Sequence, residues 1–325
     1  MILVTGASGF LGSSMVESLL EDGHDIRVII RNPAAHTYSW LKIVDVIQGD
    51  INDIKILEKA VTGVDYVIHC AATVTFWKKR RKELMATNVK GTANLVDVCL
   101  EEGVEKLVHI SSIAALGKTN DDGIVDEQSK WVKHKTTSGY AESKYRAELE
   151  VQRGVAEGLS AAIVNPGVIL GPGANWDKGT PGIIKKVDEG LPFYVESISG
   201  LVGLKDVVKA TKLVLNSSLS GGERFILVAE NWPQKRLLDT LAGLLDKPKP
   251  TIKVPPLFLR IGGRMFELWG NLTNKEPFIS LESARSASGG YEYDGSAIEE
   301  LDFSYTAVDQ VLSQTVSAYL KQKEG

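Results

Sequence analysis

Three glycines at intervals of three residues, Gly6, Gly9 and Gly12, constrain the fold of this chain more than any other feature. They lie between an apolar run at Ile2–Val4 and a helical pattern at Phe10–Asp22. A glycine loop between a strand and a helix is typical of dinucleotide binding, because the helix N-terminus offers free N–H groups and a positive dipole end to phosphates. Gly6 allows the tight turn, Gly9 lets the backbone approach a pyrophosphate, and Gly12 lets the helix lie close to the strand. A plain turn with a helix cap is the alternative, which the flanking strand and helix disfavour.

The first half of the chain alternates short apolar runs with amphipathic stretches. The runs are nearly continuous in Val, Ile and Leu, which is the pattern of parallel strands covered on both faces. Repeated strand–helix–strand units imply right-handed crossovers. We therefore predict an α/β fold with a Rossmann-type doubly wound parallel sheet. The predicted strands are Ile2–Val4, Ile26–Ile30, Ile43–Ile47, Tyr66–His69, Lys106–Ile110 and Leu159–Val164, and the predicted helices are Phe10–Asp22, Asp53–Val61, Glu83–Glu101 and Tyr140–Ala156.

After Pro166 this rhythm breaks, and loop signals such as Gly171-Pro172-Gly173 appear. We expect a dinucleotide-binding domain at 1–170, joined by elements from about 201–228, and a smaller, mostly helical substrate domain at 171–325. Predicted here are a strand at Arg224–Val228 and helices at Asp206–Asn216, Gln234–Leu245, Leu257–Trp269, Ser280–Ser286 and Ala307–Leu320. Leu257–Trp269 is amphipathic, and we interpret it as a packing helix; contact with a membrane or a role at the substrate entrance is the alternative.

Charge and composition exclude several classes of function. The 37 basic and 41 acidic residues give a net charge of −4, which argues against a nucleic-acid partner, and the run Lys78–Lys82 is interpreted as a solvated start of a helix. No apolar run is long enough to predict a membrane span. No histidine pair has metal-ligand spacing, so no metal is predicted. The two cysteines, Cys70 and Cys99, are expected to be buried apolar fillers in a cytoplasmic protein.

Three polar residues near the predicted sheet edge form a candidate catalytic group. Tyr140 and Lys144 are four residues apart at a helix start, so they share one helix face. A phenol titrates near ~10, and a neighbouring ammonium lowers its pKa. Ser112 follows the strand Lys106–Ile110, where such sheets bind ligands. Ser111 is the competing candidate, and the spacing Ser-Ser-x-x-x-x-Gly to Gly117 favours Ser112.

The motif Thr-Gly-x-x-Gly-x-x-Gly at the N-terminus resembles the extended short-chain dehydrogenase/reductase superfamily, that is, the NAD-dependent epimerase/dehydratase family. Further segments match the pattern of the family: Gly49-Asp50-Ile51, His69-Cys70-Ala71-Ala72, Thr87-Asn88-Val89-Lys90-Gly91-Thr92, Pro166-Gly167 and Leu170-Gly171-Pro172-Gly173. The resemblance implies that the cofactor is bound by Thr5, Gly6, Ser8, Gly9, Phe10, Leu11, Gly12, Arg31, Asn32, Asp50, Ile51, Ala71, Ala72, Thr73, Ser111, Tyr140, Lys144, Pro166, Gly167 and Val168.

The same resemblance implies a role for each catalytic candidate. Ser112 would hold the substrate oxygen, and Tyr140 would exchange a proton with it. Lys144 would tune Tyr140 and hold the nicotinamide ribose. Asn88 would organise a proton-relay water. Members of the family often form homodimers through the two helices that here contain Asn88 and Tyr140, so a homodimer is a further expectation.

The end of the second predicted strand bears on the choice between NAD and NADP. NAD-binding proteins of this fold carry an acid there that bonds the ribose 2′-OH. This strand instead ends in Arg31-Asn32. A guanidinium bonds phosphate oxygens bidentately, so we expect NADP(H) with Arg31 on its 2′-phosphate, although NAD is possible. A solvated surface arginine is the alternative.

The segment Val125-Asp126-Glu127, with Trp131 before Tyr140, is similar to the corresponding segment of one branch of the family. That branch contains dihydroflavonol reductases, cinnamoyl-CoA reductases and 3β-hydroxysteroid dehydrogenases. So is the tail from Glu276-Pro277-Phe278-Ile279 through Tyr293-Asp294 to Asp302-Phe303. We therefore predict an NADP(H)-dependent oxidoreductase that reduces a ketone or aldehyde to an alcohol.

The alternatives are an NAD-dependent nucleotide-sugar epimerase or dehydratase and a non-catalytic NADP-binding sensor. The Arg that commonly precedes the family's Pro in sugar-nucleotide enzymes is replaced here by Asn165. Phe76, Trp77, Val168 and Trp176 are candidate walls for a small, apolar carbonyl or alcohol substrate, which Ser112 would also contact.

Overall fold

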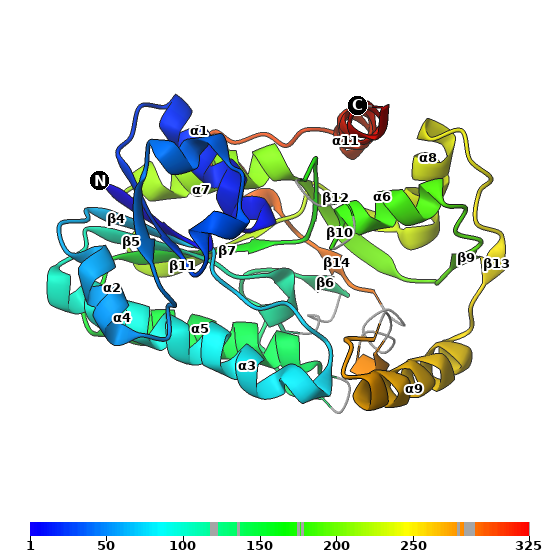
Figure 1. Ribbon diagram of the computed structural model, residues 1–325, viewed down its shortest axis with the longest axis horizontal. Helices are drawn as coiled ribbons and strands as arrows, with labels where there is room; N and C mark the ends of the chain where they lie inside the picture. Colours follow the sequence, from blue (N-terminus) through cyan, green and yellow to red (C-terminus); the bar gives the residue numbers. More distant parts are fainter. Residues whose placement is uncertain are drawn as a thin grey trace.

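A seven-stranded parallel sheet forms the centre of the computed structural model (Figure 1), which describes residues 1–117, 123–134, 137–173, 176, 179–277, 280–282 and 290–324. Its strand order is β11-β7-β5-β4-β1-β2-β3, and every neighbouring pair is parallel. The order reverses at β1 and β4, which makes their carboxyl ends the switch point where such sheets bind ligands. The predicted fold class is confirmed. The strands are β1 (Ile2–Thr5), β2 (Ile26–Ile30), β3 (Asp45–Gln48), β4 (Tyr66–His69), β5 (Lys106–Ile110), β7 (Ala161–Pro166) and β11 (Gly221–Leu227).

Helices cover both faces of this sheet, as Figure 1 shows. On one face lie α1 (Phe10–Glu21) and α7 (Leu204–Asn216), which contact each other. On the other face lie α2 (Ile54–Val61), α4 (Gly91–Glu102) and α5 (Gly139–Ala156). Side chains of one strand alternate between the two cores, so Val4 packs under α1 while its neighbour Leu3 packs under α4. Both faces of the strands are therefore buried, which explains their continuous apolar sequence.

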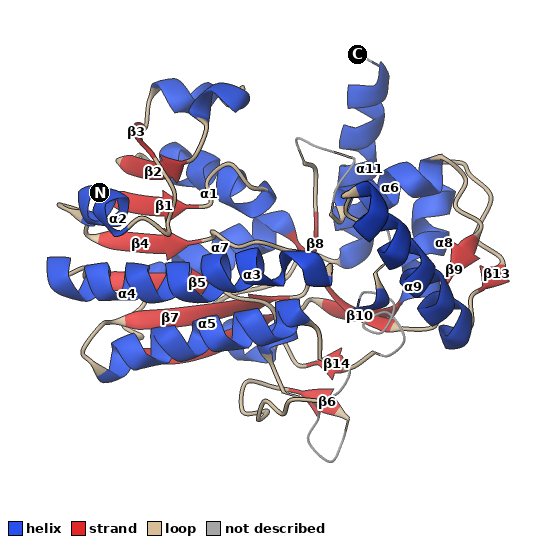
Figure 2. Cartoon of the chain, turned by 60° about the horizontal axis from the view of Figure 1, so that its bottom comes forward, coloured by secondary structure: helices blue, strands red, loops and turns tan. Residues whose placement is uncertain are grey.

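The second lobe contains helices, as predicted, and also a small sheet that the sequence does not predict (Figure 2). It contains a three-stranded sheet of β12 (Glu230–Pro233), β10 (Ile198–Gly203) and β8 (Val168–Leu170), packed with three helices around Trp232. Two short strand pairs flank it. These further elements are α6 (Pro181–Asp188), α8 (Gln234–Leu244), α11 (Val308–Glu324), β9 (Phe193–Tyr194) paired with β13 (Ile252–Lys253), and β6 (Ile124–Val125) paired with β14 (Glu292–Tyr293).

Two predicted elements differ in the structure. The third strand spans Asp45–Gln48 rather than Ile43–Ile47, because a 3₁₀ turn at Ser39–Lys42 precedes it and leaves Ile43 71% exposed. The single helix predicted at Glu83–Glu101 is divided into α3 (Arg81–Met85), a π turn at Ala86–Lys90 and α4. The helix predicted at Ser280–Ser286 lies mostly outside the described residues, as do Phe278 and Ile279.

Helix α9 (Pro256–Thr273) also departs from expectation, because it is not a packing helix of the usual kind. Its large apolar side chains face solvent, and Leu272 is 86% exposed. The buried positions of the helix are Gly263 and Gly270. Within the described ranges, no helix combines the length and the apolar character needed to cross a bilayer.

Close backbone contact at Gly12 yields a stability prediction. A Cβ atom at Gly12 would lie 2.2 Å from the carbonyl oxygen of Gly6, whereas one at Gly243, in α8, would meet nothing within 4 Å. We expect Gly12→Ala to lower the free energy of unfolding by about 3 kcal/mol or more, measured by urea denaturation. The control Gly243→Ala should leave it unchanged or raise it by up to about 1 kcal/mol. Equal effects of the two substitutions would contradict this account.

Candidate active site

In the glycine loop between β1 and α1, backbone atoms fill the space beside Gly6 and Gly12, whereas Gly9 faces open space. Gly6 has φ +70°, and a Cβ there would lie 2.6 Å from the backbone nitrogen of Ala71. Gly12 is closed by Gly6, as described above. Gly9 is exposed, and the nearest atom to a Cβ there is the Gly6 carbonyl oxygen at 3.2 Å. Gly9 is also the N-cap of α1 and provides no side-chain cap, so the first N–H groups of α1 stay available to a ligand. This open loop fits the pyrophosphate of a dinucleotide.

A buried chain of hydrogen bonds joins this loop to the helix layer. The Ala71 N–H donates to Thr5 Oγ1 (3.3 Å), and the Thr5 hydroxyl lies 2.6 Å from His69 Nδ1. His69 Nε2 lies 2.9 Å from the hydroxyl of Thr92, which donates to the Asn88 carbonyl (2.7 Å). Because the Thr92 hydroxyl donates its own proton to that carbonyl, it accepts from His69, which places a proton on His69 Nε2. Burial lowers the pKa of His69 to about 3, so the ring is neutral and this is its single proton.

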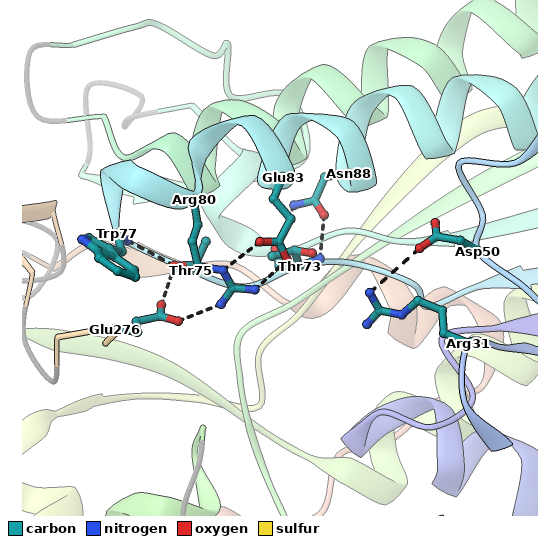
Figure 3. Close-up of polar contacts among 9 residues, drawn as sticks. All are labelled: Arg31, Asp50, Thr73, Thr75, Trp77, Arg80, Glu83, Asn88 and Glu276. Atoms are coloured by element: carbon teal, nitrogen blue, oxygen red, sulfur yellow. Dashed lines mark hydrogen bonds and ion pairs between the residues drawn. The ribbon is translucent and has the colours of Figure 1, made fainter. Parts of the chain in front are cut away.

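The Asn88 side chain lies in the π turn and clamps the segment after β4. Its Oδ1 accepts from the Thr73 N–H (2.7 Å), and its Nδ2 donates to the Thr73 carbonyl (3.0 Å). Figure 3 shows Asn88 above Thr73. Its Nδ2 also donates to Ser143 Oγ (2.9 Å), and that hydroxyl donates to the Tyr140 carbonyl (2.8 Å). The extra residue of the π turn thus turns a side chain toward both the β4 loop and α5.

Ser112 and Tyr140 meet at the carboxyl edge of the sheet. Ser112 follows β5, and its Oγ accepts from the Ala114 N–H (3.2 Å). Tyr140 lies in the first turn of α5, which the Ser138 hydroxyl caps by accepting from the Ala141 N–H (3.1 Å). Burial raises the pKa of the Tyr140 phenol, while a hydrogen bond with Ser112 acts in the opposite direction. The phenol is therefore protonated at neutral pH.

Lys144 lies one turn further along α5 and is fully enclosed. Its Nζ donates to the Ile110 carbonyl at the end of β5 (2.7 Å). Burial lowers its pKa to about 8, and the nearby Glu148 carboxyl partly opposes this. Burial and the hydrogen bond with Ser112 shift the pKa of Tyr140 here, and the tuning of Tyr140 by Lys144 stays a prediction.

Asn165, at the end of β7, supports Ser112 from below. Its Nδ2 donates to the Ser112 carbonyl (3.0 Å) and to Glu148 Oε1 (2.6 Å). Glu148 is buried, and its other oxygen lies 3.6 Å from the Arg224 guanidinium. Asn165, which stands where sugar-nucleotide enzymes commonly carry an Arg, therefore holds the backbone of Ser112.

The predicted substrate walls separate in the structure. The Phe76 ring lies edge-on to Tyr140, with 5.8 Å between ring centroids. Trp77 is buried, and its Nε1 donates to Asn271 Oδ1 of α9 (3.0 Å). Trp176 lies against Tyr319 of α11, so its described contacts do not join it to the catalytic group. Val168 begins β8 and is half-buried.

The segment that carries Phe76 is held by an ion-pair cluster shown in Figure 3. Glu276 accepts from the Thr75 hydroxyl (2.5 Å) and from Arg80 Nη1 (2.7 Å). Arg80 also forms a two-pronged contact with Glu83, at 2.6 and 2.9 Å. A residue 201 positions away thus fixes the loop, a contact for which the sequence carries no signal.

The candidate cofactor residues outside the glycine loop lie in two settings. Arg31 is 79% exposed at its side chain and lies 3.9 Å from Asp50; Figure 3 shows the pair. Exposed pairs at such distances are weak. Ile51 differs, because its side chain is buried in the core between the sheet and the helices α2, α4 and α5. A residue that the sequence analysis missed is Tyr38, whose hydroxyl donates to the Ser8 carbonyl (3.2 Å) on the glycine loop.

The remaining motifs lie around these groups. Gly173 is near the start of α1, since a Cβ there would lie 3.2 Å from the Phe10 ring. Gly167 is closed by the Gly200 carbonyl oxygen, 2.4 Å from a Cβ. Glu127 and Trp131 line a separate cavity of about 970 Å³ beside α5 and β11, which does not include Tyr140. Burial raises the pKa of both thiols to about 12; Cys99 is buried as predicted, whereas Cys70 is only half-buried.

Comparison with known proteins identifies what this arrangement is similar to. A sequence model of the NAD dependent epimerase/dehydratase family matches residues 2–227. A protein of Synechocystis named "Putative dihydroflavonol 4-reductase" is 30% identical, covering 96% of this chain and 92% of its own length. Cinnamoyl-CoA reductase 2 of Medicago truncatula is 30% identical over 77% of this chain and 78% of its own.

Solved structures agree on the fold. The structure titled gox2253 is 30% identical, has a TM-score of 0.82, and covers 99% of this chain and 98% of its own. UDP-glucose 4-epimerase of Thermotoga maritima, solved with UDP-glucose, has a TM-score of 0.80 at 20% identity, with 99% of both chains covered. At that identity the likeness establishes the fold alone.

Buried histidines make stability depend on pH. Burial lowers the pKa of His69 to about 3 and that of His109 well below its usual value, and within the described residues neither His109 ring nitrogen has a hydrogen-bond partner. Below pH ~6.5 the unfolded chain binds protons that these folded rings exclude, so stability falls as pH falls, by about 1.4 kcal/mol per pH unit for each ring.

The slope of the unfolding free energy with pH reports how many protons the chain takes up on unfolding. His109→Leu should lower that number by about one between pH 6.5 and 5, measured by urea unfolding across pH. The control His24→Gln, at an exposed position, should keep the wild-type slope. An unchanged slope in His109→Leu would show that the ring is charged when buried.

Proposed function

Because the chain belongs to the NAD dependent epimerase/dehydratase family, we propose that it reduces a ketone or aldehyde to an alcohol with NADPH, with Tyr140 as the proton donor. The observation that carries this proposal is the half-buried Tyr140 side chain, whose phenol lies beside Ser112 and has a pKa raised by burial. Reduction requires a proton for the carbonyl oxygen, and a phenol that is protonated at neutral pH can supply it.

The side chains divide the work as follows. When bound, NADPH supplies the hydride to the carbonyl carbon. Ser112 Oγ donates a hydrogen bond to the carbonyl oxygen, and the Tyr140 hydroxyl transfers its proton to that oxygen, which becomes the alcohol. Lys144, with a pKa of about 8, is protonated often enough at neutral pH to hold ribose hydroxyls and to restore the proton of Tyr140. Asn88 positions the loop at Thr73 that borders this space.

Two further features support this choice of cofactor and substrate. Arg31 directly follows β2, where an NAD-binding protein of this fold carries an acid, and its partner Asp50, at 3.9 Å, is too weak a competitor to keep it from a 2′-phosphate. Phe76 presents a ring edge beside the Tyr140 ring, which favours an apolar substrate. Sugar-nucleotide chemistry is also represented in this family and among structures at low identity, whereas the relatives at 30% identity described above carry reductase names.

Removing the phenol hydroxyl tests the catalytic assignment. Tyr140→Phe should lower kcat/KM for NADPH-dependent carbonyl reduction by about 10²–10⁴-fold, because the proton donor is lost, while NADPH binding stays intact. Tyr145→Phe is the matched control on the same helix, since it keeps the ring stacked on Trp131 at 4.1 Å. Full activity in Tyr140→Phe would refute the mechanism, and unaltered biological function without any turnover would indicate a sensor.

Removing the guanidinium tests the cofactor assignment. Arg31→Ala should weaken NADPH binding by about 10–100-fold, the contribution of charge-assisted hydrogen bonds, with NADH binding unchanged. Lys59→Ala removes one exposed cation from α2 and should change neither. Dissociation constants from calorimetry decide the point, and equal weakening of NADPH and NADH binding would exclude the 2′-phosphate role.

A further inference from the structure

Helix α9 carries a continuous apolar face that nothing in the described chain covers. The exposed side chains recur every three or four residues along its length, so they line one side of the helix. They are Leu257, Phe258, Ile261, Met265, Phe266, Leu268, Trp269 and Leu272. In Figure 1 the helix lies at the outer border of the molecule, at the lower right. We call this surface the α9 face.

The opposite side of α9 is the side that packs on the protein. A Cβ at Gly263 would lie 2.9 Å from the Ser280 carbonyl oxygen, and one at Gly270 would lie 2.7 Å from that of Lys275. The helix thus rests on its small residues and turns its large ones outward, the reverse of a helix in a globular core. Trp77 and Lys79 bond Asn271 and Asn274 at its C-terminal end, so the orientation is anchored.

Exposed cations border the α9 face. Arg260 and Arg264 lie on the helix itself. Lys79 lies beside its C-terminal end, where its Nζ donates to Asn274 Oδ1 (2.8 Å), and the exposed Lys78 and Lys82 are near Lys79 in the chain. Two acids in the same area are paired, since Arg80 binds both Glu83 and Glu276, and α9 itself carries one acid, Glu267, against its two arginines. A protein of net charge −4 therefore presents a local positive patch beside apolar side chains.

We propose that the α9 face docks on an anionic lipid surface. Leu, Phe and Trp side chains on one face of a helix, with Lys and Arg around it, have the composition of helices that lie in the interface plane of a bilayer. The cations complement lipid phosphates, and each contributes about 1 kcal/mol near such a surface. A second copy of this chain fits less well, because a two-fold contact would bring identical cations together.

The docking surface does not depend on the proposed reaction, although it lies close to it. Trp77, which bonds α9, follows Phe76, whose ring touches Tyr140. If α9 lies on a bilayer, Phe76 and the neighbouring Tyr140 would therefore lie on the side of the molecule that is near the lipid. The lipid affinity and the reductase activity remain separately measurable.

Vesicle flotation of the purified full chain tests the proposal. Binding should be at least about tenfold stronger to vesicles of phosphatidylcholine with phosphatidylglycerol than to phosphatidylcholine alone, and salt should weaken it. Met265→Gln with Leu272→Gln should lower binding to both vesicles about tenfold or more. Lys78→Gln with Lys82→Gln should lower binding to the anionic vesicles alone, by about tenfold or more.

The control Ile43→Gln removes an apolar side chain whose exposure (71%) lies between those of Met265 (66%) and Leu272 (86%), before the edge strand β3, and should bind as wild type. Trp269 provides a direct readout, because lipids brominated in the acyl chain should quench its fluorescence and Trp269→Phe should remove that quenching. No binding to anionic vesicles would overturn the proposal. A dimer in light scattering that the Met265→Gln, Leu272→Gln variant dissociates, without vesicle binding, would also overturn it and assign the face to self-association.

Discussion

The close approach of three backbone segments at Gly6 is the constraint on which the rest of the site depends. A Cβ on Gly6 would collide with the backbone of Ala71, and a Cβ on Gly12 would collide with the backbone of Gly6. The turn after β1, the start of α1 and the loop after β4 therefore meet with only backbone between them. This contact brings the free N–H groups of α1 and the loop at Thr73 to the same edge of the sheet, where a dinucleotide of this family would lie.

From that contact a buried polar network extends to the catalytic group. Thr5 and His69 connect β1 and β4 to Thr92, and Asn88 connects the π turn to both Thr73 and Ser143. Such a network is stable only if each buried donor and acceptor is satisfied, so it specifies one relative placement of α4 and α5. That placement sets Tyr140 against Ser112. The neutral His69 and the protonated Tyr140 share one physical cause, which is burial.

Local sequence was sufficient for the central sheet, because each parallel strand is apolar on both faces and each glycine of the loop has a steric reason. The family resemblance, rather than a local pattern, assigned Tyr140 and Ser112 to one catalytic group. The π turn at Ala86–Lys90, the bonding of Glu276 to Thr75 and the contact of Trp176 with α11 depend on partners far along the chain, so no local pattern reports them. For α9 the pattern gave the amphipathic character correctly, but only the structure shows that glycines face inward.

Identifying the nucleotide that is released when the purified protein is denatured tests the central claim most directly. The account predicts either NADP or an empty site that then binds NADPH more tightly than NADH, as expected for a reductase that exchanges its cofactor at each turnover. Stoichiometric NAD would contradict it. That result would mean a tightly held, internally recycled cofactor, and it would assign the chain to the epimerase or dehydratase chemistry of its structural neighbours.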